Sequence, residues 1–567
     1  MCGIHIVAGV AREQATSAIE GMIAGCVHRG PDSGAVTEAG NVFMGFNRLE
    51  IVGGAKGQQP ISNEDGSLIV VGNGEIFNYQ QSKSSHTKRH TYKTTSDIEV
   101  LLHLYEEQGM DFLSAVEGQF SFAIHDRNQN KVIIARDRWG ITPLFYAQQN
   151  GRFVVSSSVK AIIGTGFIRN ITLDPVGLAE SWSLYGPTPP RTCFRGVSQL
   201  PPATFAEYDL NTHEFLIQSF QSLSWGHLEL QNTLRRSVED RMQGSYGPGV
   251  YVSGGLDSSI IAALVNEVAE TKPILFSIAF RDPTFDESRY QTVLSEHLGC
   301  ELRTVRIDTD DIIGNIKECI HFAESPLIRT APVPMMLLSK EVRSAGIKYV
   351  LCGEGADELF AGYPVFSRGK SSVSEKWGEL SLFNSCFADD KVADIVADHF
   401  RDVTTRLGDD LTGLRKQEIA TKLSRYLLAN QGDRMAMAGS VEQRFPFLDN
   451  RVNDLAFSLN TDDLLKQGDG KFVLREMFKD LLPNELLMRK KQGYLTPDFQ
   501  VVKKLLKVGK LQSVLHPVKC AEIGIFKYSK IEPIIQHIDT EIKARFLLFA
   551  YTTHLLNGEF IVGQNNG

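Results

Sequence analysis

The feature that most constrains the fold is a glycine-rich segment, YVSGGLDSS at 251–259, which joins a short strand pattern to a helical pattern. The same order recurs downstream, with a strand pattern at 274–280, a helical pattern at 288–298 and another strand pattern at 348–351. This alternation predicts a parallel sheet with helices on both faces. Ligands bind at the carboxyl ends of strands in such sheets, so we expect a binding loop within 251–259.

The composition of this loop favours phosphate binding. Two glycines free its backbone amides, three serines supply hydroxyl groups, and a helix N-terminus follows directly. A glycine-serine turn alone could equally be structural, and the segment does not match the Walker pattern GxxxxGKS/T. The residues expected to contact phosphate are Ser253, Gly254, Gly255, Leu256, Asp257, Ser258 and Ser259.

Asp257 indicates a metal ion, because a carboxylate in a phosphate site is repulsive unless a cation intervenes. A second source of carboxylates, CGEGADELF at 352–360, follows the strand pattern at 348–351. Both loops are expected at the carboxyl ends of strands in one sheet, so Asp357 can share the metal with Asp257. The pair predicts a Mg²⁺ site.

The first third of the chain is β-rich, with helical spacing at 13–27 and 97–107, and predicts a layered αβ sandwich. Removal of Met1 would place a thiol and a free α-amine together on Cys2. An α-amine titrates near ~7.7–8.0 and a thiol near ~8.5, so the amine could accept the thiol proton at neutral pH. Cys2 is therefore a candidate nucleophile, and the alternative is a small residue without a chemical role.

Four short motifs accompany Cys2: HRGPD at 28–32, NRL at 47–49, GNGEIFN at 72–78 and SD at 96–97. Each of them alone could be turn chemistry. Together, in this order, they closely resemble the class II glutamine amidotransferase domain. That resemblance implies a sandwich of the N-terminal nucleophile type, with Cys2 as the catalytic thiol.

The resemblance also implies roles for five residues. Asn73 and the backbone amide of Gly74 would form the oxyanion hole, since both can point at one developing charge. Arg48 would bind the α-carboxylate of glutamine as a bidentate fork, and Glu75 and Asp97 would bind its ammonium group.

With both sets of motifs in this order, nearly the whole chain resembles the glutamine-hydrolysing asparagine synthetases and their relatives. The resemblance implies that Lys471 neutralises charge on the phosphates or the acyl-adenylate, and a solvated helix lysine is the alternative. One departure occurs at 157–160, where this chain has SSVK and relatives usually read Ser-Glu-Ile-Lys. We expect the missing carboxylate to alter how the two domains communicate. By resemblance, the ATP site also contains Ile278, Cys352, Gly353 and Glu354.

The implied activity consists of two coupled half-reactions. Cys2 releases ammonia from glutamine through a γ-glutamyl thioester, and ATP with Mg²⁺ activates a carboxylate as its acyl-adenylate, which ammonia converts to an amide. The domains should enclose an apolar passage, because ammonia is protonated in bulk water. Aspartate is the family's default acceptor.

The sequence specifies the identity of the acceptor carboxylic acid less clearly than the type of reaction. The segment ESPLIRTAPVP at 324–334 matches aspartate-recognition stretches only loosely, so another carboxylic acid is an alternative. Arg329 and Glu354 are the candidates for acceptor binding, and for Arg329 a surface arginine is the alternative. A noncatalytic regulator or scaffold is a further alternative, which the intact candidate catalytic residues argue against.

Composition agrees with two large domains, which we place at 2–205 and 225–555, and the polar insertion at 367–416 has no assigned role. A net charge of −8 does not indicate a surface that binds nucleic acid or anionic membranes. No apolar run reaches the ~18 residues that a membrane-spanning helix needs. Eight scattered cysteines without a CxxC pair indicate a reducing compartment, so we expect a cytoplasmic enzyme. Relatives suggest a homodimer.

Overall fold

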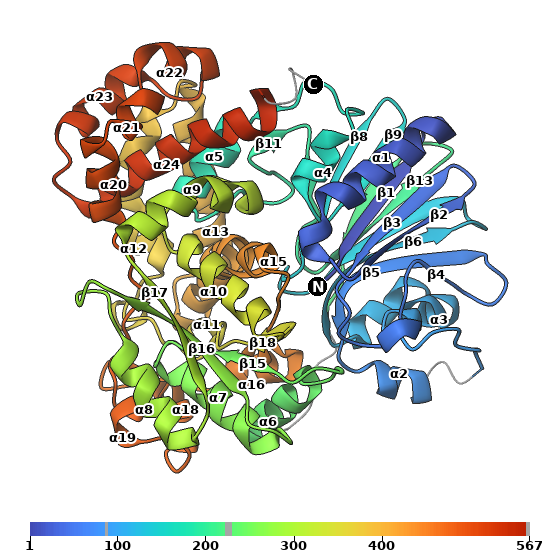
Figure 1. Cartoon of the computed structure of the whole chain (residues 1–567), viewed down its shortest axis with the longest axis horizontal. Helices are drawn as coiled ribbons and strands as arrows, with labels where there is room; N and C mark the ends of the chain where they lie inside the picture. Colours follow the sequence, from blue (N-terminus) through green and yellow to red (C-terminus); the bar gives the residue numbers. More distant parts are fainter. Residues whose placement is uncertain (86–88, 222–228, 563–567) are drawn as a thin grey trace.

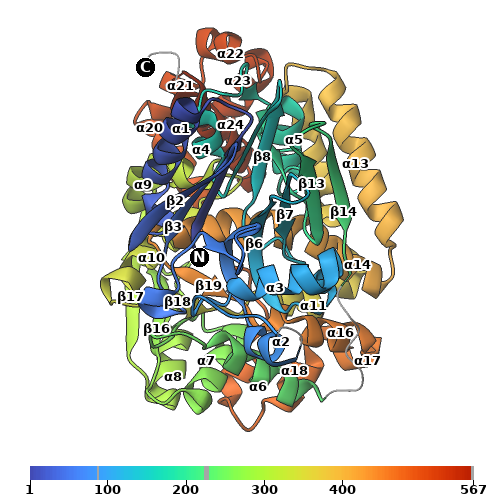
Figure 2. The ribbon, with the colours of Figure 1, turned by 90° about the vertical axis from the view of Figure 1, so that its right-hand side faces the viewer.

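The computed structural model describes residues 1–85, 89–221 and 229–562. The molecule has two halves that share a long boundary, and the N-terminus lies in the middle, where the halves meet (Figures 1 and 2). The first half is a sandwich of two antiparallel sheets, and the second is a parallel sheet surrounded by helices. The fold class expected from the sequence is confirmed in both halves.

Two six-stranded sheets pack face to face in the first half, in the orders β12-β8-β9-β1-β3-β2 and β14-β13-β7-β6-β5-β4. Side chains alternate along the strands, so Ile69 and Val71 join the core between the sheets, while Leu68 and Val70 join a separate core cluster. The strands are β1 (Gly3–Ala8), β2 (Ser33–Ala39), β3 (Val42–Arg48), β4 (Ile61–Ser62), β5 (Leu68–Ile76), β6 (Gly118–Asp126), β7 (Lys131–Arg136), β8 (Phe145–Gln149), β9 (Arg152–Ser156), β12 (Ser198–Gln199), β13 (Thr204–Asp209) and β14 (Phe215–Ser219).

Helices cover both outer faces of the sandwich, which gives the αββα layering. α1 (Arg12–Gly25) and α4 (Val159–Gly164) pack on the first sheet, and α2 (Tyr79–Ser85) and α3 (Glu99–Gln108) lie on the side of the second (Figure 1). The half also contains α5 (Pro175–Ser183) and the two-stranded pair β10 (Thr172–Leu173) and β11 (Phe194–Arg195).

The hairpin of β13 and β14 completes the second sheet, because β13 pairs with β7 as well as with β14. The sandwich therefore extends to Ser219, beyond the expected domain end at 205. The expected start of the second domain at 225 lies outside the described residues.

The second half contains a five-stranded sheet whose strands are all parallel, in the order β17-β16-β15-β18-β19. Hydrogen bonds join β15 directly to β16 and β18, so the loops that leave β15 and β18 start side by side. The strands are β15 (Gly249–Tyr251), β16 (Ile274–Phe280), β17 (Leu302–Ile307), β18 (Tyr349–Leu351) and β19 (Glu442–Arg444), and the accompanying helices are α6 (Leu230–Arg241), α7 (Leu256–Val268), α8 (Ser288–Leu298), α9 (Thr309–Ala323), α10 (Pro332–Ser344) and α11 (Ala356–Leu359).

The segment at 367–416 is helical, and its longest helix, α13, packs against α5 of the first half (Figure 2). His399 on α13 hydrogen bonds through Nδ1 to Glu180 Oε1 at 2.5 Å. No helix among the described residues is long and apolar enough to cross a membrane. The remaining elements are α12 (Ser372–Leu380), α13 (Lys391–Leu407), α14 (Leu411–Glu418), a π-helical segment (Ile419–Asp433), α15 (Arg434–Ala438), α16 (Asn450–Ser458), α17 (Thr461–Leu464), β20 (Leu465–Lys466), β21 (Asp469–Gly470), α18 (Phe472–Met477), α19 (Asn484–Leu487), α20 (Asp498–Lys507), α21 (Lys510–Val514), α22 (Pro517–Ile523), α23 (Tyr528–Gln536) and α24 (Glu541–Asn557).

Candidate active sites

Cys2 immediately precedes β1, an inner strand of the first sheet, and is 9% exposed. Its Sγ lies 3.8 Å from the carbonyl oxygen of Leu49, and Arg29 donates a hydrogen bond from Nε to the Cys2 carbonyl at 3.1 Å. Burial raises the pKa of the Cys2 thiol to about 11. The thiol is therefore protonated at neutral pH while Met1 is attached, and its reaction needs a base.

Asn73 and Gly74 are residues of β5, and Asn73 contacts Cys2. The backbone nitrogen of Cys2 donates to Asn73 Oδ1 at 2.7 Å, and that nitrogen would become the α-amine if Met1 were removed. Gly74 has a φ of +117°, and a Cβ there would lie 1.9 Å from the carbonyl oxygen of Gln119. Only glycine fits this position, because both the backbone conformation and the contact with β6 exclude a side chain.

Three further predicted residues border the same region. Arg48, at the end of β3, donates from Nη2 to the carbonyl oxygen of Gly54. Asp97 accepts the backbone N–H of Ile76 at Oδ2, 2.8 Å away, and burial raises its pKa to about 6. Burial also raises the pKa of Glu75, although an arginine of the second half lies next to it.

That arginine, Arg444, is one of two charged residues that β19 brings into the first half. Its Nη2 lies 3.0 Å from Glu75 Oε1, and its Nε donates to Glu442 Oε1 at 2.7 Å. Glu442 Oε2 lies 2.5 Å from the N-terminal nitrogen of Met1. No pattern in the segment VEQRFPFLD at 441–449 indicates these contacts.

The predicted phosphate loop connects β15 to α7 and is held by its own hydroxyl groups. Ser258 Oγ accepts the backbone N–H of Ser253 at 3.2 Å, and Ser259 Oγ donates to the carbonyl oxygen of Gly255 at 2.8 Å. Gly254 has a φ of +73°, and its carbonyl oxygen accepts a hydrogen bond from Arg489 Nη1 at 2.8 Å. Arg489 was missed by sequence reasoning, because it is far away along the chain.

Asp257 and Asp357 come together as predicted, joined by lysines. Lys471 Nζ lies 2.6 Å from Asp257 Oδ2 and 2.5 Å from Asp357 Oδ1, and Lys491 Nζ lies 2.5 Å from Asp357 Oδ2. Burial raises the pKa of Asp257. It acts in the same direction on Asp357, but the two ammonium groups outweigh it and hold the pKa of that carboxyl low. Lys491 is a further residue that the sequence analysis missed.

These two carboxylates suit a Mg²⁺ ion. Oδ1 of Asp257 is buried and has no hydrogen-bond partner among the described residues. Hard oxygen donors from two strand ends, with phosphate oxygens expected beside them, are the ligand set that Mg²⁺ prefers. Asp257 and Asp357 are thus the residues that would hold the Mg²⁺ ion. The ion would supply positive charge that offsets the charge of the carboxylates and the phosphates.

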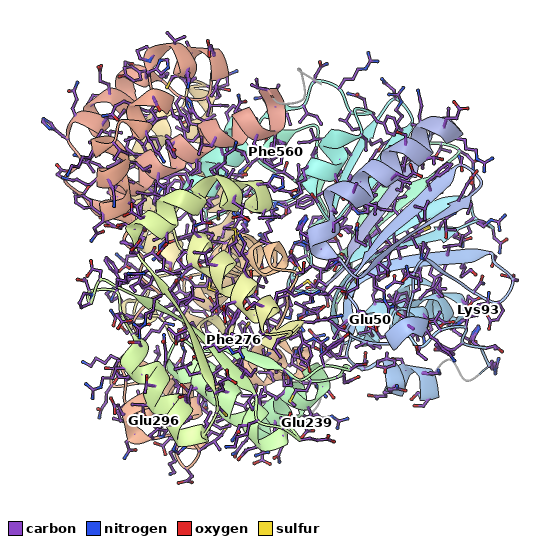
Figure 3. All side chains as sticks on the ribbon, in the orientation of Figure 1. Glu50, Lys93, Glu239, Phe276, Glu296 and Phe560 are labelled. Carbon is purple, nitrogen blue, oxygen red and sulfur yellow. The ribbon has the colours of Figure 1, made fainter. Side chains whose placement is uncertain are left out.

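Two adjoining cavities of about 240 and 230 Å³ border Asp257, and the smaller also borders Asp357. The smaller is lined by Ile278, Gly353, Glu354 and Arg329, together with Phe276 of β16, which is labelled in Figure 3. Both cavities are bordered by Ser253, Asp257, Glu287, Tyr363, Lys491 and Gln492.

Three residues expected at the nucleotide lie behind the cavity walls. Cys352 is 0% exposed and lines neither cavity, because its side chain packs into the core beneath the loop. Gly254 and Ser259 also line neither of them, and they shape the loop through the hydrogen bonds described above. The place of Cys352 in the ATP site stays a prediction.

Arg329 borders the smaller cavity but is held by protein groups. Its Nη2 donates to the carbonyl oxygen of Tyr494 at 2.6 Å, and its Nε lies 3.6 Å from Asp498 Oδ2. Arg545 Nε donates to the same carboxylate oxygen at 2.9 Å. The Arg329 guanidinium therefore already interacts with Tyr494 and Asp498. Glu354 also borders the cavity, and burial raises its pKa.

Glu324 contacts the segment SSVK at 157–160, which lacks the carboxylate usual in relatives. Its two oxygens accept hydrogen bonds from Val159 N at 2.8 Å, from Lys160 N at 3.0 Å and from Ser158 Oγ. Glu324 belongs to the second half, directly after α9, and is 6% exposed. The first turn of α4 is thus capped from the opposite domain, a contact that no local sequence pattern indicated.

Comparison with known proteins identifies both halves. Residues 229–539 match the asparagine synthase family, and residues 1–220 match the glutamine amidotransferase domain. Asparagine synthetase B of Escherichia coli is 28% identical over 484 residues, covering 82% of this chain and 76% of that protein. Asparagine synthetase 1 of Bacillus subtilis is 27% identical, covering 83% and 82%. Amidase chyE of Penicillium rubens is 25% identical, covering 83% of both chains.

Proposed function

Because the chain belongs to the asparagine synthase family and is a glutamine-dependent amidotransferase, we propose that it forms asparagine from aspartate, with glutamine as nitrogen donor and ATP cleaved to AMP and pyrophosphate. The observation that carries this proposal is β19. The strand belongs to the synthetase sheet beside β18, yet its Glu442 and Arg444 contact groups next to Cys2. One strand thus connects the two reaction centres.

In the glutaminase reaction, Cys2 attacks the side-chain amide of glutamine after Met1 is removed. Asn73 Oδ1 already accepts a hydrogen bond from the Cys2 nitrogen, which positions that nitrogen to take the thiol proton as a free amine. The amide of Gly74 and the side chain of Asn73 stabilise the oxyanion. Arg48 binds the substrate carboxylate, and Asp97 with Glu75 binds its ammonium group.

In the synthetase reaction, the segment at 253–259 binds the pyrophosphate of ATP at the N-terminus of α7. Asp257 and Asp357 would hold Mg²⁺, which would neutralise phosphate charge. Lys471 lies between both carboxylates, where its ammonium group adds positive charge beside the phosphates or the acyl-adenylate. Lys491 and Arg489 add positive charge along the same cavities, where the leaving pyrophosphate would lie.

Ammonia must then pass from Cys2 to the smaller cavity beside Asp357. We propose that it follows the buried contact between β6 and β19, because Gln119 on β6 donates from Nε2 to the carbonyl oxygen of Gln443 on β19 at 2.8 Å. Both residues are 1% exposed, so water is excluded from this contact and ammonia stays unprotonated.

An acceptor other than aspartate is the second candidate. A small zwitterion needs several free charge partners, and Arg329 is already paired with Asp498. Amidase chyE, which is as long a match as the asparagine synthetases, carries a different name for its activity. Glu354 also borders this cavity and could meet a substrate ammonium group.

The deciding experiment is a screen of carboxylic acids with saturating ammonium, ATP and Mg²⁺, in which pyrophosphate and the amide product are measured together. Stimulation by aspartate with asparagine formed supports the proposal. Stimulation only by another acid supports the second candidate. Absence of pyrophosphate release with every acid, from a protein that hydrolyses glutamine, would reject an active synthetase site, and the Asp257→Asn variant provides the blank.

Three further expectations also stand as proposals. We propose a glutaminase domain from Cys2 to Ser219 and a synthetase domain that begins before α6. The eight cysteines are all buried and free, which suits the cytoplasm. A homodimer is testable by light scattering on the purified chain.

A further inference from the structure

A second group of metal-ligating side chains lies on the glutaminase domain, away from both reaction centres. His90, His103, Glu64 and Glu106 each present one ligand atom, and all four atoms lie within 4.8 Å of one another. The cluster joins the turn after β4, the segment before Asp97 and helix α3. Lys93, in that segment, lies at the outer edge of the domain, on the side opposite the second half (Figure 3).

The distances within the cluster are close to those of a tetrahedral metal site. His90 Nδ1 lies 3.2 Å from Glu64 Oε1 and 3.6 Å from Glu106 Oε2. His103 Nδ1 lies 3.1 Å from Glu106 Oε2 and 3.8 Å from Glu64 Oε2. Zinc bonds of ~2.0–2.2 Å to nitrogen and oxygen require ligands about 3.3–3.6 Å apart in a tetrahedron. Glu64 faces the two imidazoles with different oxygens, so its carboxylate must turn to place one ligand atom from each residue on one ion.

An outer carboxylate also orients His90 for metal binding. His90 presents Nδ1 to the cluster, and its Nε2 hydrogen bonds to Glu107 Oε1 at 3.2 Å. A ligating histidine typically donates its other N–H to a carboxylate, which fixes the tautomer and makes the free nitrogen more basic. His103 likewise presents Nδ1 to the cluster, and its buried Nε2 lies 3.8 Å from Glu99 Oε1 without a hydrogen-bond partner among the described residues.

Charge and access favour a cation as well. Four glutamates surround two imidazoles, so the cluster is negative even with both rings protonated. Lys93 Nζ donates to Ser62 Oγ at 3.3 Å and to the carbonyl oxygen of Asn63, so this ammonium group is held by neutral partners. The side chains of Glu64 and Glu106 are 37% and 26% exposed, whereas His103 is 0% exposed. An ion can therefore enter from solvent and reach a buried ligand.

We propose that His90, His103, Glu64 and Glu106 bind a zinc ion. Two imidazole nitrogens with two carboxylates at tetrahedral spacing suit Zn²⁺ better than Mg²⁺, which prefers six oxygen ligands. The ion ties the segment that contains His90 to helix α3. Asp97, proposed above as a glutamine ligand, follows that segment directly, so the metal stabilises the outer wall of the glutaminase site.

The test uses the full chain, stripped with a chelator and then dialysed against Zn²⁺ alone. We expect one high-affinity zinc per chain by elemental analysis, and Co²⁺ in its place should give the intense visible bands of tetrahedral coordination. The variants His90→Gln and Glu64→Gln should each weaken Zn²⁺ binding by at least the 10–100-fold typical for loss of an outer-shell partner. Both replaced side chains are partly exposed, so both variants should fold.

Two controls make the result specific. His537→Gln removes an exposed histidine elsewhere and should keep the full zinc content. Asp257→Asn should also keep it, which separates this site from the proposed Mg²⁺ site. The proposal is overturned if the wild-type chain binds no zinc above the background of the double variant His90→Gln/Glu64→Gln. It is equally overturned if the zinc content falls in Asp257→Asn and not in His90→Gln.

Discussion

The contact of Glu324 with α4 should contribute strongly to the stability of the joined domains, and Glu324→Ala tests this. The change leaves two backbone N–H groups and the Ser158 hydroxyl without their carboxylate partner. Each buried polar group left unpaired costs about 1–3 kcal/mol, which gives ~3–9 kcal/mol for the three. Glu324 also borders a cavity of about 410 Å³ between the domains, from which water can replace part of the loss. We therefore expect a loss of ~3–5 kcal/mol in the free energy of unfolding.

The assay is urea denaturation of the full chain, with the midpoint shift converted at constant slope. Asp308→Ala is the matched control, because Asp308 caps α9 through Asp310 N at 2.8 Å and Asp311 N at 3.0 Å within one half of the molecule. Its exposed side chain should contribute only about 0.5–2 kcal/mol. Glu324→Gln retains one acceptor oxygen and should fall between the two. A loss for Glu324→Ala no larger than that of Asp308→Ala would refute the reasoning from burial.

The remaining predictions concern the two reaction centres. Cys2→Ala should abolish glutamine hydrolysis and spare amide synthesis from ammonium salts, measured as product formed with each nitrogen source, and a preparation that retains Met1 should behave alike. Asp257→Asn and Asp357→Asn should each remove ATP-dependent pyrophosphate release but not basal glutaminase activity, and the double variant should cost little more, since groups that act as one unit are not additive. Gly74→Ala should lower kcat for glutamine hydrolysis at least tenfold, which corresponds to a rise of about 1.4 kcal/mol in the activation barrier, because the new Cβ would overlap the backbone of β6. KM for glutamine should rise as the pH falls through about 6, where Asp97 takes up a proton and loses its charge, and Asp97→Asn should lack that limb of the profile. Because this pKa is higher in the folded than in the unfolded state, the folded state binds more protons between about pH 4 and 6. The contribution of Asp97 to the free energy of unfolding should therefore fall as the pH rises from about 4 to 6, and Asp97→Asn should remove this pH dependence.

The sequence was sufficient where a functional residue directly follows a predicted strand. The glycine-rich segment at 251–259 joins strand β15 to helix α7 as predicted. Asp357 lies near Asp257 because neighbouring parallel strands bring their carboxyl ends together. Strand Ile274–Phe280 and helix Ser288–Leu298 were predicted with the bounds that the structure shows, since turn residues and hydrophobic periodicity agree there. Glycine at 74 is likewise a local requirement of the backbone.

Tertiary structure alone decided the contacts between groups that are hundreds of residues apart. Glu442 reaches the nitrogen of Met1, Arg444 reaches Glu75, and Glu324 caps α4, in each case across the boundary of the two domains. Periodicity and spacing describe only which face of an element is buried, and they contain no information on which distant element will cover it. The sequence by itself therefore determined the two chemistries of this protein, but the way their centres are joined depends on domain packing, because a buried charge must find its partner wherever the packed surfaces place one.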